Sequence, residues 1–218
     1  MSRPIGRPRA IIFDWDNTLV DTWPTIHEAF VHCQKTMGVP LWTLDEAKVR
    51  VRLSLREAFP PLFGDRWEEA RRVYLEHFEA IHLDRMRALP GCDTMLRQLA
   101  DSGLYLAVVS NKTGELLRRE ADHLGWSPMF GRIVGAGDAA QDKPAPDPVL
   151  MALEPSGIVP GEDVWFVGDT DADMECAIAS GCMPVLLHTS ATGAEFIRVP
   201  PRLWFADAAR FFDHVRGL

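Results

Sequence analysis

Residues 11–22 read Ile-Ile-Phe-Asp-Trp-Asp-Asn-Thr-Leu-Val-Asp-Thr, an apolar stretch that runs directly into acidic side chains. The uninterrupted apolar run at 10–13 is typical of a strand that helices cover on both faces. Asp14 and Asp16 follow two residues apart, so in extended backbone they point the same way. A carboxylate pair at the carboxyl end of a parallel strand lies where open α/β sheets bind ligands. Because neighbouring carboxylates repel unless a cation or proton lies between them, the pair indicates Mg²⁺ chemistry.

Three later segments also place polar or charged side chains near the end of a predicted strand or the start of a predicted helix. The apolar strand at 104–109 runs into Ser110, Lys143 precedes a predicted helix in the proline-rich stretch 142–148, and the strand at 164–167 leads into an acidic cluster at 169–173. Each has an ordinary structural explanation when taken alone, since a serine can cap a strand end and a lysine can lie on the surface. Their combination and order make them informative.

In this order, the motifs Asp14-x-Asp16-x-Thr18, Ser110, Lys143 and Gly168-Asp169-x-x-x-Asp173 resemble the haloacid dehalogenase superfamily of phosphohydrolases. The resemblance spans about residues 9–187, and its spacing fits the subgroup that inserts a helical cap after the first motif. It implies a phosphatase in which Asp14 attacks phosphorus to form an aspartyl-phosphate. Asp16 would protonate the leaving alkoxide and later deprotonate the water that hydrolyses the intermediate.

The resemblance also implies two sets of ligands. The residues expected to hold Mg²⁺ are Asp14, Asp16 (through its backbone carbonyl), Asp169 and Asp173. The residues expected to bind the phosphoryl oxygens are Thr18, Ser110, Asn111 and Lys143. Asp171 is a weaker candidate for the metal than Asp173.

Composition excludes several other classes of protein. The chain has 218 residues, of which 47% are hydrophobic and 25% charged, an ordinary globular composition. No apolar run approaches the roughly 20 residues of a membrane span, and the N-terminal stretch is too short for a signal peptide. Four cysteines without C-x-x-C spacing favour reduced thiols in a cytoplasmic protein. The net charge of −8 argues against nucleic acid as a partner, and we expect a monomer or homodimer.

The organisation of the chain predicts an α/β fold. From about residue 92, strands and helices alternate, which implies a doubly wound parallel sheet with a Rossmann-like core. Helices predicted at 25–37, 43–50, 54–59 and 66–83 interrupt this pattern and carry no strand. We interpret residues 22–89 as a helical cap inserted into a core formed by residues 1–21 and 90–218, although these helices could instead form one layer of a single domain. Proline and glycine at both joints are typical of hinges.

Variation within the first motif separates the branches of the resembled family. An acid at position 16 argues against dehalogenases, which have no alkoxide to protonate, and against the phosphonate-cleaving members, which carry a small residue there. Thr18 favours phosphatases over sugar phosphomutases, which tend to have valine. Asn17 stands where many relatives have glycine, and asparagine tolerates the left-handed conformation at modest cost.

The cap segment 49–59 resembles the specificity segment of phosphoglycolate-phosphatase-like members. Arg50, Arg52 and Arg56 are candidates for binding a substrate carboxylate, although they could equally form a solvated helix face. Arg52 stands where those members usually have glycine. We therefore expect a Mg²⁺-dependent phosphatase for a small phosphorylated metabolite, with phosphoglycolate as the leading substrate. The alternatives are a sugar-phosphate phosphatase, a phosphomutase or a phosphate-binding regulator without turnover.

Overall fold

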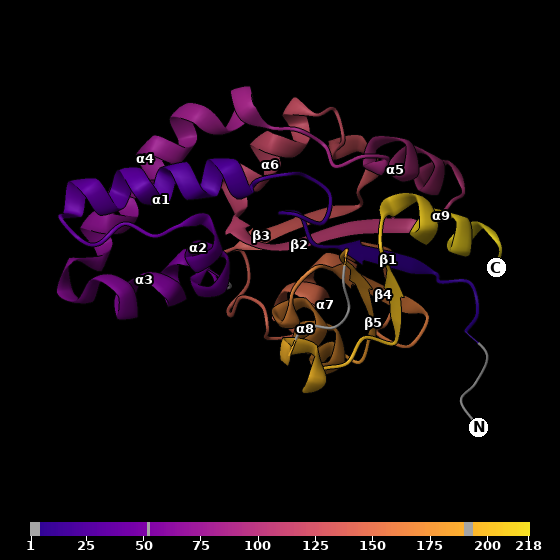
Figure 1. Cartoon of the computed structure of the whole chain (residues 1–218). Helices are drawn as coiled ribbons and strands as arrows, with labels where there is room; N and C mark the ends of the chain where they lie inside the picture. The colour runs from indigo at the N-terminus through magenta and orange to yellow at the C-terminus, as the bar shows by residue number, and fades with distance from the viewer. Residues whose placement is uncertain (1–4, 52, 190–193) are drawn as a thin grey trace.

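The computed structural model describes residues 5–51, 53–189 and 194–218, and a six-stranded parallel sheet forms its centre (Figure 1). The strands lie in the order β3-β2-β1-β4-β5-β6. Their bounds are β1 Ala10–Phe13, β2 Tyr105–Thr113, β3 Arg132–Ala136, β4 Val164–Gly168, β5 Met183–Leu187 and β6 Leu203–Phe205. The chain order reverses between β1 and β4, and such a switch point is where doubly wound sheets bind their ligands.

Helices cover both faces of the sheet. One face packs against α5 (Cys92–Asp101), α6 (Gly114–His123) and α9 (Ala208–Arg216), and the other against α7 (Asp147–Leu153) and α8 (Asp171–Ser180) (Figure 1). In β1, Ile11 and Phe13 enter the first layer and Ile12 the second, and none of them is exposed. This two-sided burial explains the unbroken apolar run in the sequence. The predicted doubly wound fold is confirmed.

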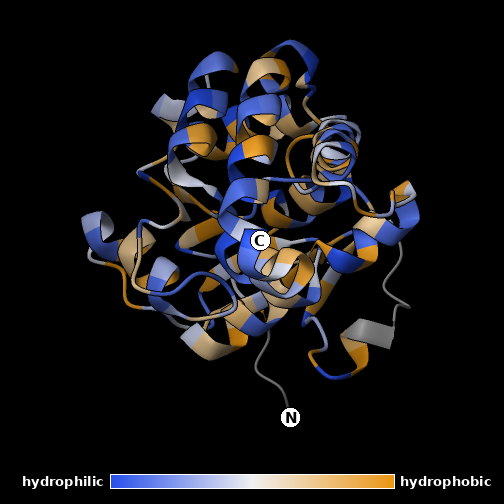
Figure 2. Cartoon of the chain, turned by 90° about the vertical axis from the view of Figure 1, so that its left-hand side faces the viewer, coloured by the Kyte–Doolittle hydropathy of each residue, from blue (hydrophilic) through white to orange (hydrophobic). Residues whose placement is uncertain are grey.

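Four helices form a separate layer over one end of the sheet, and we refer to them as the cap. They are α1 (Trp23–Met37), α2 (Leu44–Arg50), α3 (Leu55–Phe63) and α4 (Trp67–Arg85). Their shared core centres on Phe30, whose ring contacts Phe59 and Tyr74 at centroid distances of 5.6 and 4.8 Å. Figure 2 views the molecule from the cap side and shows hydrophobic and hydrophilic residues interspersed along these helices, as expected of amphipathic elements.

Two elements are longer than the sequence predicted. Helix α3 continues to Phe63 through Pro60 and Pro61, although prolines normally end a helix. Prolines at these positions leave the carbonyls of Arg56 and Glu57 without backbone donors, and both residues are exposed, so water can satisfy them. Strand β2 extends through Ser110 to Thr113, with a register irregularity against β3 after Val109.

The two joints of the cap lie side by side. Val20 and Ala88 form an antiparallel bridge, flanked by hydrogen bonds from Asp21 N to Arg87 O and from Leu89 N to Leu19 O, each 2.9 Å long. The chain thus leaves and re-enters the core through a short two-stranded stem.

The remaining described segments are connections. Short 3₁₀ turns occupy Gly64–Arg66, Ser127–Met129, Glu154–Ser156 and Ala194–Ile197. Cys33, Cys92, Cys176 and Cys182 are buried and unbridged. Within the described residues, no helix combines the length and apolar character needed to cross a bilayer.

Candidate active site

The turn after β1 aims its two carboxylates into one cavity. Asp14 N donates to Val167 O at 2.8 Å, which continues the sheet pairing of β1 with β4 past Phe13. Asn17 then adopts a left-handed φ of 63°. Its side-chain oxygen accepts hydrogen bonds from Thr22 N (3.3 Å) and Trp23 N (3.2 Å), so the turn is tied to the start of α1. Asn17 therefore adopts the left-handed backbone conformation for which many proteins use glycine. Its side chain also holds the start of α1, at the first joint of the cap.

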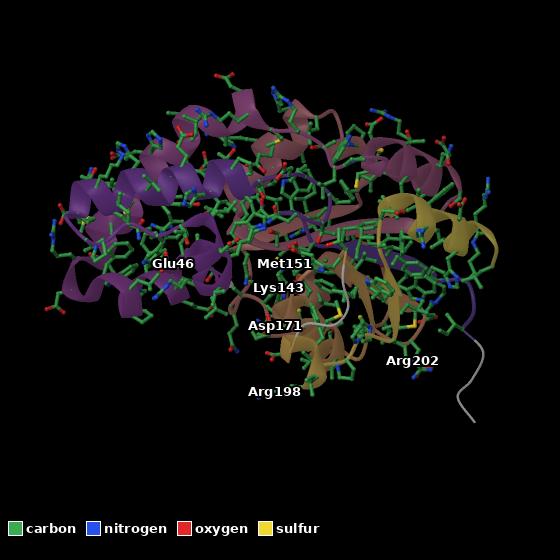
Figure 3. All side chains as sticks on the ribbon, in the orientation of Figure 1. Glu46, Lys143, Met151, Asp171, Arg198 and Arg202 are labelled. Carbon is green, nitrogen blue, oxygen red and sulfur yellow. The ribbon has the colours of Figure 1, made fainter. Side chains whose placement is uncertain are left out.

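Lys143 connects the nucleophile candidate to the last motif. Its Nζ lies 2.6 Å from Asp14 Oδ1 and 2.7 Å from Asp173 Oδ1, and all three side chains are buried. Figure 3 shows Lys143 where the cap meets the core. Burial raises the pKa of Asp14, the charges of Asp173 and Asp16 raise it further, and Lys143 lowers it; the balance lies at about 7. The two carboxylates outweigh burial and raise the pKa of Lys143, so the lysine stays charged.

The start of α8 holds Asp173 in place. Asp173 Oδ2 accepts from Thr170 N (3.0 Å) and Thr170 Oγ1 (2.7 Å), while Thr170 Oγ1 caps the helix by accepting from Asp173 N. This capping box leaves Oδ1 free for Lys143. Gly168 is required beside it, because a Cβ there would lie 2.3 Å from the Asp173 carboxyl carbon.

Asp14, Asp169 and Asp173 form a candidate metal site. One carboxylate oxygen from each lies within 4.8 Å of the others. Thr18 Oγ1 donates to Asp169 Oδ1 at 3.1 Å, so its hydroxyl holds a carboxylate at the edge of the cavity. Burial, followed by the charges of Asp14 and Asp173, raises the pKa of Asp169 well above its ordinary value. Three carboxyl groups this close together suit a hard, oxygen-seeking divalent cation.

Ser110 and Asn111 line the same cavity as Asp14 and Asp16. Ser110 Oγ accepts from Lys112 N at 3.2 Å, which leaves its hydroxyl hydrogen available. Asn111 Nδ2 donates to Lys143 O at 3.1 Å and so fixes the loop that carries the lysine. The roles of Thr18, Ser110 and Asn111 as phosphate ligands remain predictions.

A second buried lysine was missed by the sequence reasoning. Lys112 Nζ lies 2.6 Å from both Asp16 Oδ1 and Glu120 Oε2. Glu120 is fully buried in α6 and also accepts from Trp15 Nε1 (2.7 Å) and from His82 Nδ1 of the cap (2.8 Å). The sequence did contain a signal for this lysine. Lys112 stands two residues after Ser110 on the same strand, so the two side chains point the same way, as those of Asp14 and Asp16 do.

This network acts on the pKa of Asp16 in opposite directions. Burial raises the pKa of Asp16, Lys112 lowers it and Glu120 raises it, and the net direction is upward. Burial also works to raise the pKa of Glu120, but Lys112 and the hydrogen bonds from His82 and Trp15 outweigh it, so Glu120 stays ionised. A buried carboxyl whose pKa is raised is suited to general acid chemistry.

The cap arginines contact other partners. The Arg50 guanidinium lies 5.1 Å from the centroid of the Trp42 ring. Arg56 Nε pairs with Asp142 Oδ2 at 2.5 Å, which connects α3 to the loop before Lys143. Arg52 lies outside the described residues. Neither Arg50 nor Arg56 is among the residues that line the cavity, and the prediction that an arginine of this segment binds a substrate carboxylate stays untested.

Comparison with known proteins identifies the family of this chain and several of its relatives. Residues 11–186 match the model of the family described as haloacid dehalogenase-like hydrolase. Over 179 residues, the chain is 34% identical to a phosphoglycolate phosphatase of Aquifex aeolicus, covering 82% of this chain and 84% of that protein. It is 28% identical over 211 residues to the phosphoglycolate phosphatase of Xanthomonas campestris, covering 90% and 95%. A haloacid dehalogenase-like family hydrolase from Streptococcus pneumoniae superimposes with a TM-score of 0.84 at 24% identity, covering 95% and 98%.

Proposed function

This chain belongs to the haloacid dehalogenase-like hydrolase family, and on that basis we propose that it is a Mg²⁺-dependent phosphatase that works through an aspartyl-phosphate on Asp14. The observation that carries the proposal is the separate pairing of two adjacent carboxylates. Asp14 pairs with Lys143, and Asp16 pairs with Lys112. The two members of one motif thus have different electrostatic surroundings, as a nucleophile and a proton carrier need.

The donor set fits Mg²⁺. Asp14 and Asp169 would hold the ion, together with Asp173 and the backbone carbonyl of Asp16. Carboxylate and carbonyl oxygens are the ligands that this ion prefers, and the raised pKa values of Asp14 and Asp169 are consistent with a missing positive charge. When bound, the ion would withdraw negative charge from a phosphoryl oxygen and so favour attack by an anion.

In the first step, an Asp14 carboxylate oxygen forms a bond to phosphorus as the ester P–O bond breaks. Asp16 gives its proton to the departing alkoxide oxygen, which leaves as an alcohol. Lys143 orients Asp14 by donating a hydrogen bond to its Oδ1, while Ser110 and Asn111 would bind phosphoryl oxygens. The charge of the dianionic ester is thus met by positioned donors before the nucleophile approaches.

In the second step, Asp16 takes a proton from a water molecule, whose oxygen attacks the phosphorus of the acyl phosphate. The bond from phosphorus to the Asp14 oxygen breaks, and inorganic phosphate leaves. Lys112 would hold Asp16 in one orientation through both steps, because its ammonium contacts Asp16 and the fixed carboxylate of Glu120 at once. Lys112 acts as a positioning residue in this scheme.

We propose residues 22–89 as the cap domain that closes over the substrate, with the core supplying the chemistry. The substrate is a small phosphorylated metabolite. Phosphoglycolate is the first compound to assay, because relatives at 28% and 34% identity are named for it.

The test is phosphate release with Mg²⁺ and after chelation, for the wild type, Asp14→Asn and the exposed control Asp101→Asn. We expect chelation and Asp14→Asn each to abolish turnover, and Asp101→Asn to match the wild type. If Asp14→Asn retains more than about a tenth of the rate, a loss of barely 1.4 kcal/mol, Asp14 is not the nucleophile.

A further inference from the structure

The cavity over Asp14 and Asp16 is polar on the core side and apolar on the cap side. It contains about 810 Å³ of atom-free space, including its open mouth. The core side carries the carboxylates, Ser110, Asn111 and two lysines. The cap side consists largely of hydrophobic side chains, among them Trp23, Ile26, Leu53, Leu55, Leu75 and Phe78.

The lysines in this cavity are already neutralised. Lys143 lies between Asp14 and Asp173, and Lys112 between Asp16 and Glu120, with every Nζ–oxygen distance at 2.6 or 2.7 Å. Two ammonium groups thus face four paired carboxylates, and Asp169 adds a fifth. Both ammonium groups thus already contact two carboxyl groups each, and the phosphoryl group brings further negative charge. The core side has no positive charge left for a second anion on the substrate.

Among the described residues of the cap, none that lines the cavity is an arginine, lysine or histidine, and Lys48 Nζ lies 5.9 Å from the centroid of the Trp23 ring. Arg50 lies over Trp42, and Arg56 is paired with Asp142. Tyr74 contributes a ring and a hydroxyl to the wall, and burial raises its pKa well above the ordinary value, so that hydroxyl is neutral. Figure 3 shows Arg198 below the core helices and Arg202 at the end of the core away from the cap.

We infer that the alcohol part of the substrate carries an apolar group, aliphatic or aromatic, rather than a second carboxylate. The inference rests on the proposed phosphatase function and names its substrate class. Once the phosphoryl group contacts the core motifs, the rest of the ester lies against the hydrophobic wall. A carboxylate there would lose its water without gaining a charged partner, whereas an apolar group would gain from leaving water.

Three esters that share the same CH₂–O–phosphoryl unit test the inference. Ethyl phosphate carries a methyl group on that carbon, benzyl phosphate a phenyl ring and phosphoglycolate a carboxylate. All three release a primary alcohol, so the need for acid catalysis is similar. We expect kcat/KM to be at least about ten-fold higher for benzyl phosphate than for phosphoglycolate, with ethyl phosphate between them. Equal or better hydrolysis of phosphoglycolate would overturn the inference.

Binding of unreactive analogues separates this question from turnover. 2-Phenylethylphosphonate and 3-phosphonopropionate replace the ester oxygen of benzyl phosphate and phosphoglycolate by CH₂, and calorimetry with Mg²⁺ gives their dissociation constants. Tighter binding of the phenyl compound supports the inference, and tighter binding of the carboxylate overturns it, even if no ester is hydrolysed. Absence of phosphate release from every ester would refute the proposed function instead.

A positive charge placed on the wall should shift the preference toward phosphoglycolate. Leu53 lines the cavity and is 42% exposed, so Leu53→Arg can be accommodated, and Val49→Arg, 68% exposed and outside the lining, is the matched control. The ratio of kcat/KM for phosphoglycolate to that for benzyl phosphate should rise at least about ten-fold in Leu53→Arg and stay unchanged in Val49→Arg. An unchanged ratio in Leu53→Arg would contradict contact between this wall and the alcohol part. A wild-type preference for phosphoglycolate that Arg52→Ala abolishes would overturn the inference and assign the carboxylate to Arg52.

Discussion

Removing the ammonium of Lys112 should destabilise the protein more than removing any surface lysine. Lys112 Nζ contacts Asp16 and Glu120 at 2.6 Å, and the exposed fractions of the three side chains are 5%, 20% and 0%. Lys112→Met keeps most of the aliphatic chain. It removes the ammonium, which lies 5.1 Å from the centroid of the Phe78 ring, and so leaves both carboxylates without their lysine. Burying an unpaired charge is among the most costly changes a mutation can make.

The structure sets the size of the effect. Breaking a buried pair by removing one partner costs about 3–5 kcal/mol. Trp15 and His82 still donate to Glu120 in the variant, and Asp16 retains some access to water, so we expect the lower end, about 3 kcal/mol. For a chain of this length, that corresponds to a fall in Tm of roughly 6–12 °C. Removing the charge of Glu120 as well should recover part of the lost stability, because one of the two carboxylates that Lys112 had paired with is then neutral.

The assay is denaturant and thermal unfolding of Lys112→Met, Glu120→Gln and the double variant, with Lys35→Met on the exposed side of α1 as the control. The double variant should lose at least about 1 kcal/mol less than the sum of the single changes. A Lys112→Met protein within about 1 kcal/mol of the wild type would refute the view that this lysine neutralises a buried acidic pair. Additive single effects would show that Lys112 and Glu120 act independently.

Three further predictions concern the carboxylates of the first motif. Ca²⁺ accepts more oxygens and looser geometry than Mg²⁺, so it should bind but support little phosphate release, and equal rates with the two ions would contradict a site that needs a monodentate Asp14. Asp16→Asn should slow phosphorylation of the enzyme by alkyl phosphates more than by aryl phosphates in single-turnover experiments, because good leaving groups need less protonation; equal slowing would exclude Asp16 as the acid. The pKa of Asp14 is about 7 in the folded metal-free protein against an ordinary value of 3.8, so the folded state holds the extra proton between these limits and its stability falls as pH rises through them. The Tm of Asp14→Asn should therefore exceed that of the wild type by an amount that grows from about pH 4 to pH 7 and shrinks with saturating Mg²⁺. A difference that stays constant with pH would show that ionisation of Asp14 does not destabilise the folded state.

The fold was predictable because its signals are local. The unbroken apolar run of β1 reports burial on both faces, and the glycines after several helices mark where those helices end. The predicted end of α3 was wrong because Pro60 and Pro61 lie within the helix. Propensity rules describe average costs, so they do not identify a position where two prolines are tolerated within a helix.

The partners of charged side chains were not predictable in the same way. Lys112 contacts Glu120 nearly two turns into the following helix, and His82 contacts the same carboxylate from the cap, 38 residues earlier in the chain. Arg56 finds Asp142 across 86 residues. Such contacts depend on how the cap docks on the core, and periodicity carries no information about docking. Residue type and motif order located the four core motifs, but only the structure identifies which cation neutralises which carboxylate.

The stem formed by Val20 and Ala88 makes the cap exchangeable. Because the chain leaves and returns through one bridged pair of segments, the core closes on itself whatever lies between them. Doubling the length of a flexible insertion costs only about 0.6 kcal/mol in closure entropy, so a longer or differently built lid would burden the core little. Evolution can therefore change what the lid recognises while the phosphoryl-transfer residues stay as they are. A chimaera that carries a relative's cap on this stem should inherit the relative's substrate range and keep this chain's chemistry.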